Sequence, residues 1–193
     1  MTEKLKYAII GAGCMGQEHI LNIEIIDDAE VVALCDTSEK SIKESLDLLN
    51  NDVAIFDNYI DLVEANIADA FIIATPNFTH IEVLKEVMKS EAHLLIEKPL
   101  CTTVKDCQEF EKLAVDYPGV IWTAMEYRYM PPVQRMIKEI HNKTIGDLKM
   151  LSIREHRFPF LHKVDDWNRF AIKTGGTLVE KCCHFSDLMR LIA

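Results

Sequence analysis

Residues 5–16 read Leu-Lys-Tyr-Ala-Ile-Ile-Gly-Ala-Gly-Cys-Met-Gly, a short apolar run followed at once by three spaced glycines. The run predicts a buried strand, and Gly11, Gly13 and Gly16 form the pattern G-x-G-x-x-G where a helix would begin. The first glycine permits a tight turn, the second lets the backbone approach a pyrophosphate, and the third lets the helix pack on the strand. The backbone N–H groups at the start of that helix, at Cys14 and Met15, would face the phosphates. This stretch therefore predicts a dinucleotide-binding turn.

The rest of the first two thirds of the chain alternates between strand-like and helix-like stretches. Helical spacing at i, i+3 and i+7 occurs at Ile81, Leu84 and Met88, and again at Cys107, Phe110 and Ala114. Near-continuous apolar strands that alternate with helices indicate a parallel sheet covered on both faces. We therefore predict an α/β fold with a doubly wound parallel sheet over residues 1–125. Its further strands are expected at 31–35, 70–74, 93–96 and 120–124.

The pattern changes after Tyr129. A helix is expected from Pro131 to about His141, because proline suits the first turn of a helix. A long strand is expected at 147–158 and a last helix at about 177–192. One strand and one or two helices do not close a core, because a strand needs partners. We therefore expect residues 126–193 to be the start of an incomplete α+β domain.

Composition excludes several classes of protein. Lys and Arg number 21 against 31 Asp and Glu, so the formal charge is −10, which argues against nucleic-acid and anionic-membrane partners. No apolar run reaches the roughly 18–20 residues of a membrane span, and the N-terminus lacks a signal-peptide pattern. The six cysteines have no C-x-x-C spacing. Without an export signal we expect reduced thiols in a cytoplasmic protein.

Asp36 lies at the end of the second predicted strand, 20 residues beyond Gly16. A carboxylate at this position can accept hydrogen bonds from ribose hydroxyls, and it favours NAD over NADP because a 2′-phosphate would meet like charge. Lys40 is close enough in sequence to leave NADP open. Two alternatives remain: a structural glycine turn with Asp36 as a helix cap, and a methyltransferase, which can share these glycines and this acidic residue.

Two further segments follow predicted strands, at the edge where open α/β sheets bind ligands. The first is Thr75-Pro-Asn-Phe-Thr-His80, in which Asn77 or Thr79 could cap the next helix as well as contact a cofactor. The second is Glu97-Lys98-Pro99-Leu100. Lys98 would point into the same crevice, where partial burial makes a lysine easier to titrate, and Pro99 could follow a cis peptide bond. A solvated surface lysine is the alternative.

Glu180, His184 and Asp187 are spaced i, i+4 and i+7, so they share one stripe of the predicted last helix. A polar stripe on an otherwise apolar helix indicates a polar cleft, and an exposed Glu–His pair is the alternative. His184 lies beside Cys182 and Cys183, but adjacent helical residues point to different faces. We therefore expect no metal site.

Together these motifs resemble the Gfo/Idh/MocA family of NAD(P)-dependent sugar and polyol dehydrogenases. The motifs are the glycine turn, TPNxTH, EKPL, YRY-x-P and GG-x-L-x-E-x-x-x-H-x-x-D, in this order. The resemblance implies an N-terminal Rossmann domain, and a C-terminal α/β domain whose open sheet carries the substrate pocket and often joins dimers or tetramers. Family members continue well beyond the H-x-x-D segment, so we expect a C-terminally truncated chain. A homo-oligomer is expected if that sheet is complete.

The resemblance also implies roles for individual residues. Lys98 matches the lysine of EKP and His184 the catalytic histidine. Glu180, the third expected catalytic residue, stands where many members have aspartate and could orient His184 or bind a neighbouring hydroxyl. The expected activity is hydride transfer between NAD and a CH–OH group of a sugar, polyol or derivative. The alternative is a non-catalytic NAD(P)-binding regulatory or scaffold protein, or an inactive fragment. The remaining implied site residues are Thr75, Asn77, His80 and Glu97 for the cofactor, and Tyr127, Trp167 and Asp187 for the substrate.

Overall fold

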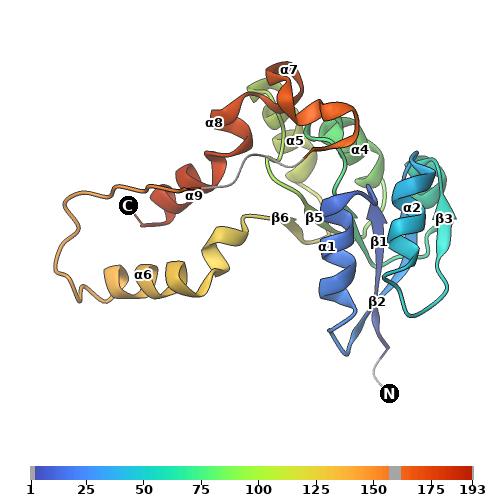
Figure 1. The fold of residues 1–193 in the computed structure, drawn as a ribbon, viewed down its shortest axis with the longest axis horizontal. Helices are drawn as coiled ribbons and strands as arrows, with labels where there is room; N and C mark the ends of the chain where they lie inside the picture. The colour runs from blue at the N-terminus through green and yellow to red at the C-terminus, as the bar shows by residue number, and fades with distance from the viewer. Residues whose placement is uncertain (1–2, 157–161, 193) are drawn as a thin grey trace. The chain divides into compact units, whose positions relative to one another are not determined.

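The computed structural model describes residues 3–156 and 162–192. They belong to two compact units, Met1–Thr123 and Ala124–Ala193. The first unit holds the sheet shown in Figure 1, and all its described strands pair in parallel. Its elements are β1 (Leu5–Ile10), α1 (Cys14–Ile23), β2 (Ala29–Cys35), α2 (Glu39–Leu46), β3 (Ala54–Phe56), α3 (Tyr59–Ala65), β4 (Ala70–Ile73), the 3-10 helix η1 (Asn77–Thr79), α4 (His80–Val87), β5 (His93–Ile96), α5 (Val104–Ala114) and β6 (Ile121–Thr123).

The sheet has the strand order β3-β2-β1-β4-β5-β6. The chain moves outward in one direction from β1 through β2 to β3, and in the other direction from β4 to β6. The connections that follow β1 and β4 therefore lead to opposite halves of the sheet, and the sheet's topological switch point, where open sheets of this kind bind ligands, lies between these two strands. The predicted doubly wound parallel sheet is confirmed.

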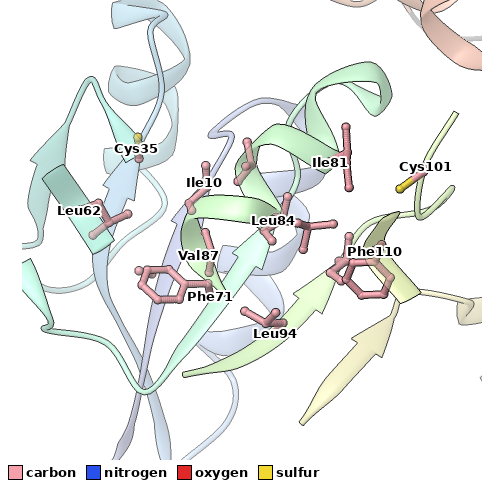
Figure 2. Close-up of a cluster of buried hydrophobic side chains, with 14 of the residues drawn as sticks. Ile10, Cys35, Leu62, Phe71, Ile81, Leu84, Val87, Leu94, Cys101 and Phe110 are labelled. Carbon is pink, nitrogen blue, oxygen red and sulfur yellow. The ribbon is translucent and has the colours of Figure 1, made fainter. Parts of the chain in front are cut away.

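Two apolar layers cover the sheet because successive side chains of each strand point to opposite faces. Ile9 and Ile72 pack on one face against Ile20 of α1. Their neighbours along the strands turn to the other face, where Figure 2 shows Ile10 and Phe71 with Leu84 of α4. Burial on both faces explains why these strands read as unbroken apolar runs in the sequence.

The helices of this unit begin in two different ways. The side chains of Ser38, Asn58 and Thr103 cap α2, α3 and α5 by accepting a backbone N–H of the first turn. Helix α1 follows Gly13, which offers no side chain to its first N–H groups. The start of α1 therefore keeps backbone donors directed outward at the switch point.

The glycines around α1 allow a close approach of backbone segments. Gly11 has φ +99°, and a Cβ there would lie 2.6 Å from the carbonyl carbon of Ala74. A Cβ on Gly16 would lie 2.1 Å from the carbonyl oxygen of Gly11, whereas a Cβ on Gly13 would meet no described atom within 4 Å. Packing therefore requires Gly11 and Gly16, and leaves open space in front of Gly13.

The second unit differs from its prediction in two places. Residues 147–156 form no strand, and residues 157 and 158 of the predicted strand lie outside the described residues. The physical reason is that the described part of this unit contains no strand for them to pair with. The elements found are η2 (Glu126–Tyr129), α6 (Pro131–His141), η3 (Val164–Arg169), α7 (Ala171–Thr174), α8 (Thr177–Glu180) and α9 (Cys183–Ile192).

The predicted helix over 177–192 is also wrong as one piece, because it divides into α8 and α9 at Lys181 and Cys182. In the first unit, strand β3 was not predicted. It has only three residues, and two of them are exposed at the sheet edge, so it lacks an apolar run.

Replacing Gly16 with Ala should destabilise the first unit by about 2 kcal/mol or more, because the new methyl group overlaps backbone that cannot move aside cheaply. Replacing Gly13 with Ala adds the same methyl group where there is space and should leave the melting temperature nearly unchanged. Thermal unfolding followed by circular dichroism measures both variants. Equal losses in the two would contradict the close approach of Gly16 to Gly11.

Candidate functional site

The glycine turn is held by the carboxylate at the end of β2. Asp36 Oδ2 accepts the backbone N–H of Ala12 at 2.7 Å, and Oδ1 accepts that of Ser38 at 2.8 Å. Ser45 of α2 donates its hydroxyl to the Ala12 carbonyl at 2.9 Å. Each carboxylate oxygen can accept more than one hydrogen bond, so Asp36 keeps acceptor capacity for a sugar hydroxyl while it fixes the turn.

The loop after β4 brings a buried amide to the same edge of the sheet. Asn77 is 7% exposed, and its Nδ2 makes no hydrogen bond to any described residue. A buried N–H donor without a partner is costly in a protein interior, so this amide is suited to a ligand acceptor.

The predicted capping of α4 by Asn77 or Thr79 is wrong. Asn77 begins η1, and although Thr79 is the residue before α4, its side chain makes no cap hydrogen bond. Thr79 Oγ1 turns back to lie 2.8 Å from Thr75 Oγ1 and 2.7 Å from the Pro76 carbonyl oxygen. These contacts close the loop on itself. They also explain the missing cap, because a hydroxyl that bonds to nearby backbone is not available to cap the helix.

The turn after β5 contains Lys98, which is half-buried, and the Lys98–Pro99 peptide bond is cis. Glu97 beside it is buried, with Oε1 2.8 Å from Nε2 of His19 on α1, and Oε2 accepts the Lys98 N–H at 3.2 Å. Burial alone would raise the pKa of Glu97, but the hydrogen bond and charge of His19, helped by Lys98, outweigh it and lower that pKa. An ionised Glu97 therefore ties the Lys98 turn to α1.

His80 is the first residue of α4 and is fully buried. Its Nε2 lies 3.0 Å from the carbonyl oxygen of Thr75, and its Nδ1 lies 3.0 Å from that of Pro99. Burial lowers the pKa of His80 against the opposing effect of these carbonyl oxygens and of Glu97. The imidazole is thus held neutral between two loops.

These three segments follow β1, β4 and β5, which are neighbours in the sheet. Their shared edge combines an uncapped helix start, a carboxylate at the end of β2 and an unpaired amide. A dinucleotide fits this combination, because pyrophosphate needs N–H donors and ribose needs a carboxylate acceptor. The structure brings together the predicted residues at 11–16, 36, 75–80 and 97–98 on this edge; each one's contact with a cofactor stays a prediction.

The second unit contains a separate polar cluster around His184, whose side chain is 1% exposed. The Tyr127 ring stacks on the imidazole with centroids 4.1 Å apart and planes 6° apart. Nε2 of His184 lies 3.3 Å from Oε1 of Glu126. The helix break places Glu180 in α8 and His184 in α9, and the expected role of Glu180, to orient His184 or to bind a neighbouring hydroxyl, stays a prediction. The continuous helical stripe of Glu180, His184 and Asp187 is therefore wrong.

Lys181 is a residue of this cluster that sequence reasoning missed. It is buried, with Nζ 3.1 Å from Oε2 of Glu155, and it donates to the hydroxyl of Tyr127. That hydroxyl donates to Oε1 of Glu155 at 2.5 Å. The sequence offered little signal for this role, because Lys181 stands next to Glu180 and its partner Glu155 is far away along the chain.

The predicted substrate residues fall in different places. Asp187 forms a two-pronged salt bridge with Arg128, through Nε at 2.5 Å to Oδ2 and through the terminal nitrogen to Oδ1. This pair joins η2 to α9. Tyr127 lies in the His184 cluster, whereas Trp167 lies half-buried in η3. Contact of these three residues with a substrate stays a prediction.

Within residues 3–156 and 162–192, no group of three or more His, Cys, Asp and Glu side chains is arranged to hold a metal ion. No helix among the same residues has the length and apolar character needed to cross a bilayer.

Comparison with known proteins gives two family matches. Residues 5–125 match the model described as "Oxidoreductase family, NAD-binding Rossmann fold", and residues 137–193 match "Oxidoreductase family, C-terminal alpha/beta domain". These matches favour an oxidoreductase over a methyltransferase.

Individual relatives agree with the family match. The rhizopine catabolism protein MocA of Rhizobium meliloti is 24% identical over 97% of this chain and 56% of its own length. The inositol 2-dehydrogenase of Pseudarthrobacter chlorophenolicus is 30% identical over 82% of this chain and 47% of its own length. The chain thus spans about half the length of the curated relatives it matches.

Solved structures show the same fold. An oxidoreductase from Thermotoga maritima superposes with a TM-score of 0.83 at 21% identity, over 98% of this chain and 60% of its own. The WlbA dehydrogenase from Bordetella pertussis, solved with NADH and UDP-GlcNAcA, gives 0.81 at 21% identity, over 99% and 59% of the two chains.

The buried His80 should make the first unit less stable as the solution is acidified. Its folded pKa is lowered from the ordinary 6.5, so the unfolded chain takes up the proton first. The neutral ring contributes its full stabilisation above the unfolded pKa of 6.5, and this stabilisation is lost as the pH falls from 6.5 toward the lower folded pKa. We expect His80→Gln to lose less free energy of unfolding than the unaltered protein between about pH 7 and pH 5. Urea unfolding at several pH values measures this, and parallel pH dependences would contradict it.

Proposed function

Because this chain belongs to the oxidoreductase family with an NAD-binding Rossmann fold, we propose that it is the dinucleotide-binding part of a dehydrogenase. The reaction would transfer hydride between the CH–OH group of a sugar, polyol or derivative and NAD. The main support for this proposal is that the glycine turn, the Asn77 loop and Lys98 follow three neighbouring parallel strands. One extended ligand along this edge would meet all three.

The division of labour follows the two units. Residues 1–125 would hold the dinucleotide, and residues 126–193 would begin the substrate domain. Asp36 would bind the ribose of the adenosine half, the start of α1 the pyrophosphate, and Asn77 a polar group farther along the ligand. The bound NAD supplies the carbon that accepts the hydride. The negative charge of Asp36 favours NAD over NADP.

The chemistry proposed for the chain's own residues is proton handling at one alcohol oxygen. His184 would accept the hydroxyl proton, a role suited to a group whose unperturbed pKa lies near neutral pH. Lys98 would donate a hydrogen bond to the same oxygen and stabilise the negative charge that develops on it. Glu126, whose side chain is 53% exposed, would stabilise the charged imidazole of His184 and pass the proton from His184 to solvent.

Relatives support a small hydroxylated substrate. The similar chain from Thermotoga maritima is named myo-inositol 2-dehydrogenase and is 26% identical over 97% of this chain. For this protein we propose the same broad class of substrate, a cytoplasmic location, and no nucleic-acid or membrane partner. A homo-oligomer formed through the C-terminal domain is part of the proposal.

Replacing Asp36 with Asn should weaken NADH binding about tenfold, because the neutral amide is a poorer acceptor for ribose hydroxyls. The preference for NADH over NADPH should narrow, because the 2′-phosphate no longer meets a like charge. Fluorescence titration with both nucleotides measures this. The matched control is Asp52→Asn, the same change at an exposed carboxylate of a loop, which should change either affinity by less than about twofold. An unchanged nucleotide preference in Asp36→Asn would contradict the assignment.

Replacing Lys98 with Met or His184 with Asn in the full protein should lower turnover by about two to four decades, the scale of acid–base groups. NADH affinity should change little, because neither side chain is proposed to bind the adenosine or pyrophosphate. Initial rates over a panel of polyols and sugars test this, with Lys105→Met and His141→Asn as exposed controls of the same types. NADH binding with ordinary turnover in both site variants would remove these residues from the mechanism. Binding with no turnover of any substrate in the unaltered protein would instead favour a regulatory protein.

A further inference from the structure

One buried imidazole connects the Asn77 loop with the Lys98 turn. Nε2 of His80 reaches the Thr75 carbonyl oxygen at 3.0 Å. On the other side of the ring, Nδ1 reaches the carbonyl oxygens of Pro99 at 3.0 Å and Leu100 at 3.3 Å. The ring therefore bridges two loops that follow neighbouring strands β4 and β5.

The chemistry of this bridge is unusual because every partner is an acceptor. A neutral imidazole has one N–H and one lone pair, and a carbonyl oxygen can only accept. Complete burial lowers the pKa of His80 and disfavours the doubly protonated ring that could donate on both sides. The proton must therefore lie on Nε2, facing Thr75, or on Nδ1, facing Pro99 and Leu100.

Both ends of the bridge lie next to groups proposed to meet the ligand. Thr75 is two residues from Asn77, whose buried Nδ2 makes no hydrogen bond within the described chain. Pro99 directly follows Lys98. The other side of Lys98 is anchored separately, through Glu97 and His19 of α1. The position of the Lys98 turn thus depends on two histidines, and His80 is the one that also holds the Asn77 loop.

We propose that His80 is a positioning residue that couples the loop at Asn77 to the turn at Lys98, so that a dinucleotide bound at the loop sets the Lys98 side chain in place. This inference rests on the proposed function. It deepens that function by assigning to a fully buried residue the link between cofactor binding and catalysis.

Two substitutions separate the arms of the bridge. The amide nitrogen of Asn lies near the position of Nδ1, so His80→Asn places a donor toward the Lys98 turn and removes the contact with Thr75. The amide nitrogen of Gln lies near the position of Nε2, so His80→Gln places a donor toward Thr75 and removes the contact with the Lys98 turn.

We expect opposite kinetic effects. His80→Asn should raise the dissociation constant for NADH about tenfold with turnover within about threefold of the unaltered protein, the size of one buried hydrogen bond. His80→Gln should lower turnover at least tenfold at saturating NAD and leave NADH affinity within about threefold. His93→Gln is the matched control, because it perturbs a comparable hydrogen bond, from the Val120 N–H to Nδ1 at 3.0 Å, at the opposite end of β5. His93→Gln should lower the free energy of unfolding without a selective change in either NADH affinity or turnover.

A second readout does not need turnover. Amide hydrogen exchange at residues 100–103 should slow when NADH binds the unaltered protein, and this slowing should disappear in both His80 variants while protection at residues 77–79 persists. If a variant fails to fold, nitrogen NMR of the His80 ring in the unaltered protein gives the answer. The shifts of Nδ1 and Nε2 should move on NADH addition, and unmoved shifts would overturn the coupling.

Other outcomes separate the two proposals. Parallel changes of affinity and turnover in both His80 variants, as in a general loss of stability, would show that His80 only supports the fold. Persistent exchange coupling together with full activity of Lys98→Met would retain the link and remove the proposed mechanism.

Discussion

The contact on which the first unit depends is the approach of Gly11 to the backbone of Ala74 and Thr75. It brings the loops after β1 and β4 to within van der Waals distance at the point where the chain reverses its direction across the sheet. A side chain at residue 11 would separate these loops, and one at residue 16 would push α1 off its strand. Asp36 then completes the turn by accepting the Ala12 N–H. The arrangement places backbone donors, a carboxylate and a buried amide on one edge of the sheet.

Much of this unit could be predicted because its information is local. An apolar run buried on both faces identifies a strand, as at 5–10 and 93–96, where the predicted bounds agree with the structure. The glycine pattern and the distance from Gly16 to Asp36 reflect short-range geometry. Strand β3 could not be found in this way, because an exposed three-residue edge strand depends on its pairing with β2 rather than on its own residues.

The contacts that define the candidate site were harder to predict from the sequence. Contact of His80 with the cofactor, expected from its motif, stays a prediction, and its two ring nitrogens lie 3.0 Å from carbonyl oxygens on two loops that are far apart in sequence. In the second unit, the break at Lys181 and Cys182 places Glu180 and His184 in different helices, and Glu126 lies 3.3 Å from the imidazole. Lys181 and Glu155 are partners across a long stretch of chain. Such pairings follow from tertiary packing, which a single sequence pattern does not encode.

A crystal structure of the NADH complex tests the central claim most directly. The account predicts pyrophosphate oxygens within hydrogen-bond distance, about 2.7–3.2 Å, of the backbone N–H groups that open α1. It also predicts the nicotinamide ring beside the Lys98 side chain, with a polar atom of the ligand on Asn77 Nδ2. A nucleotide bound elsewhere, with the start of α1 bare and Asn77 still unpaired, would contradict it.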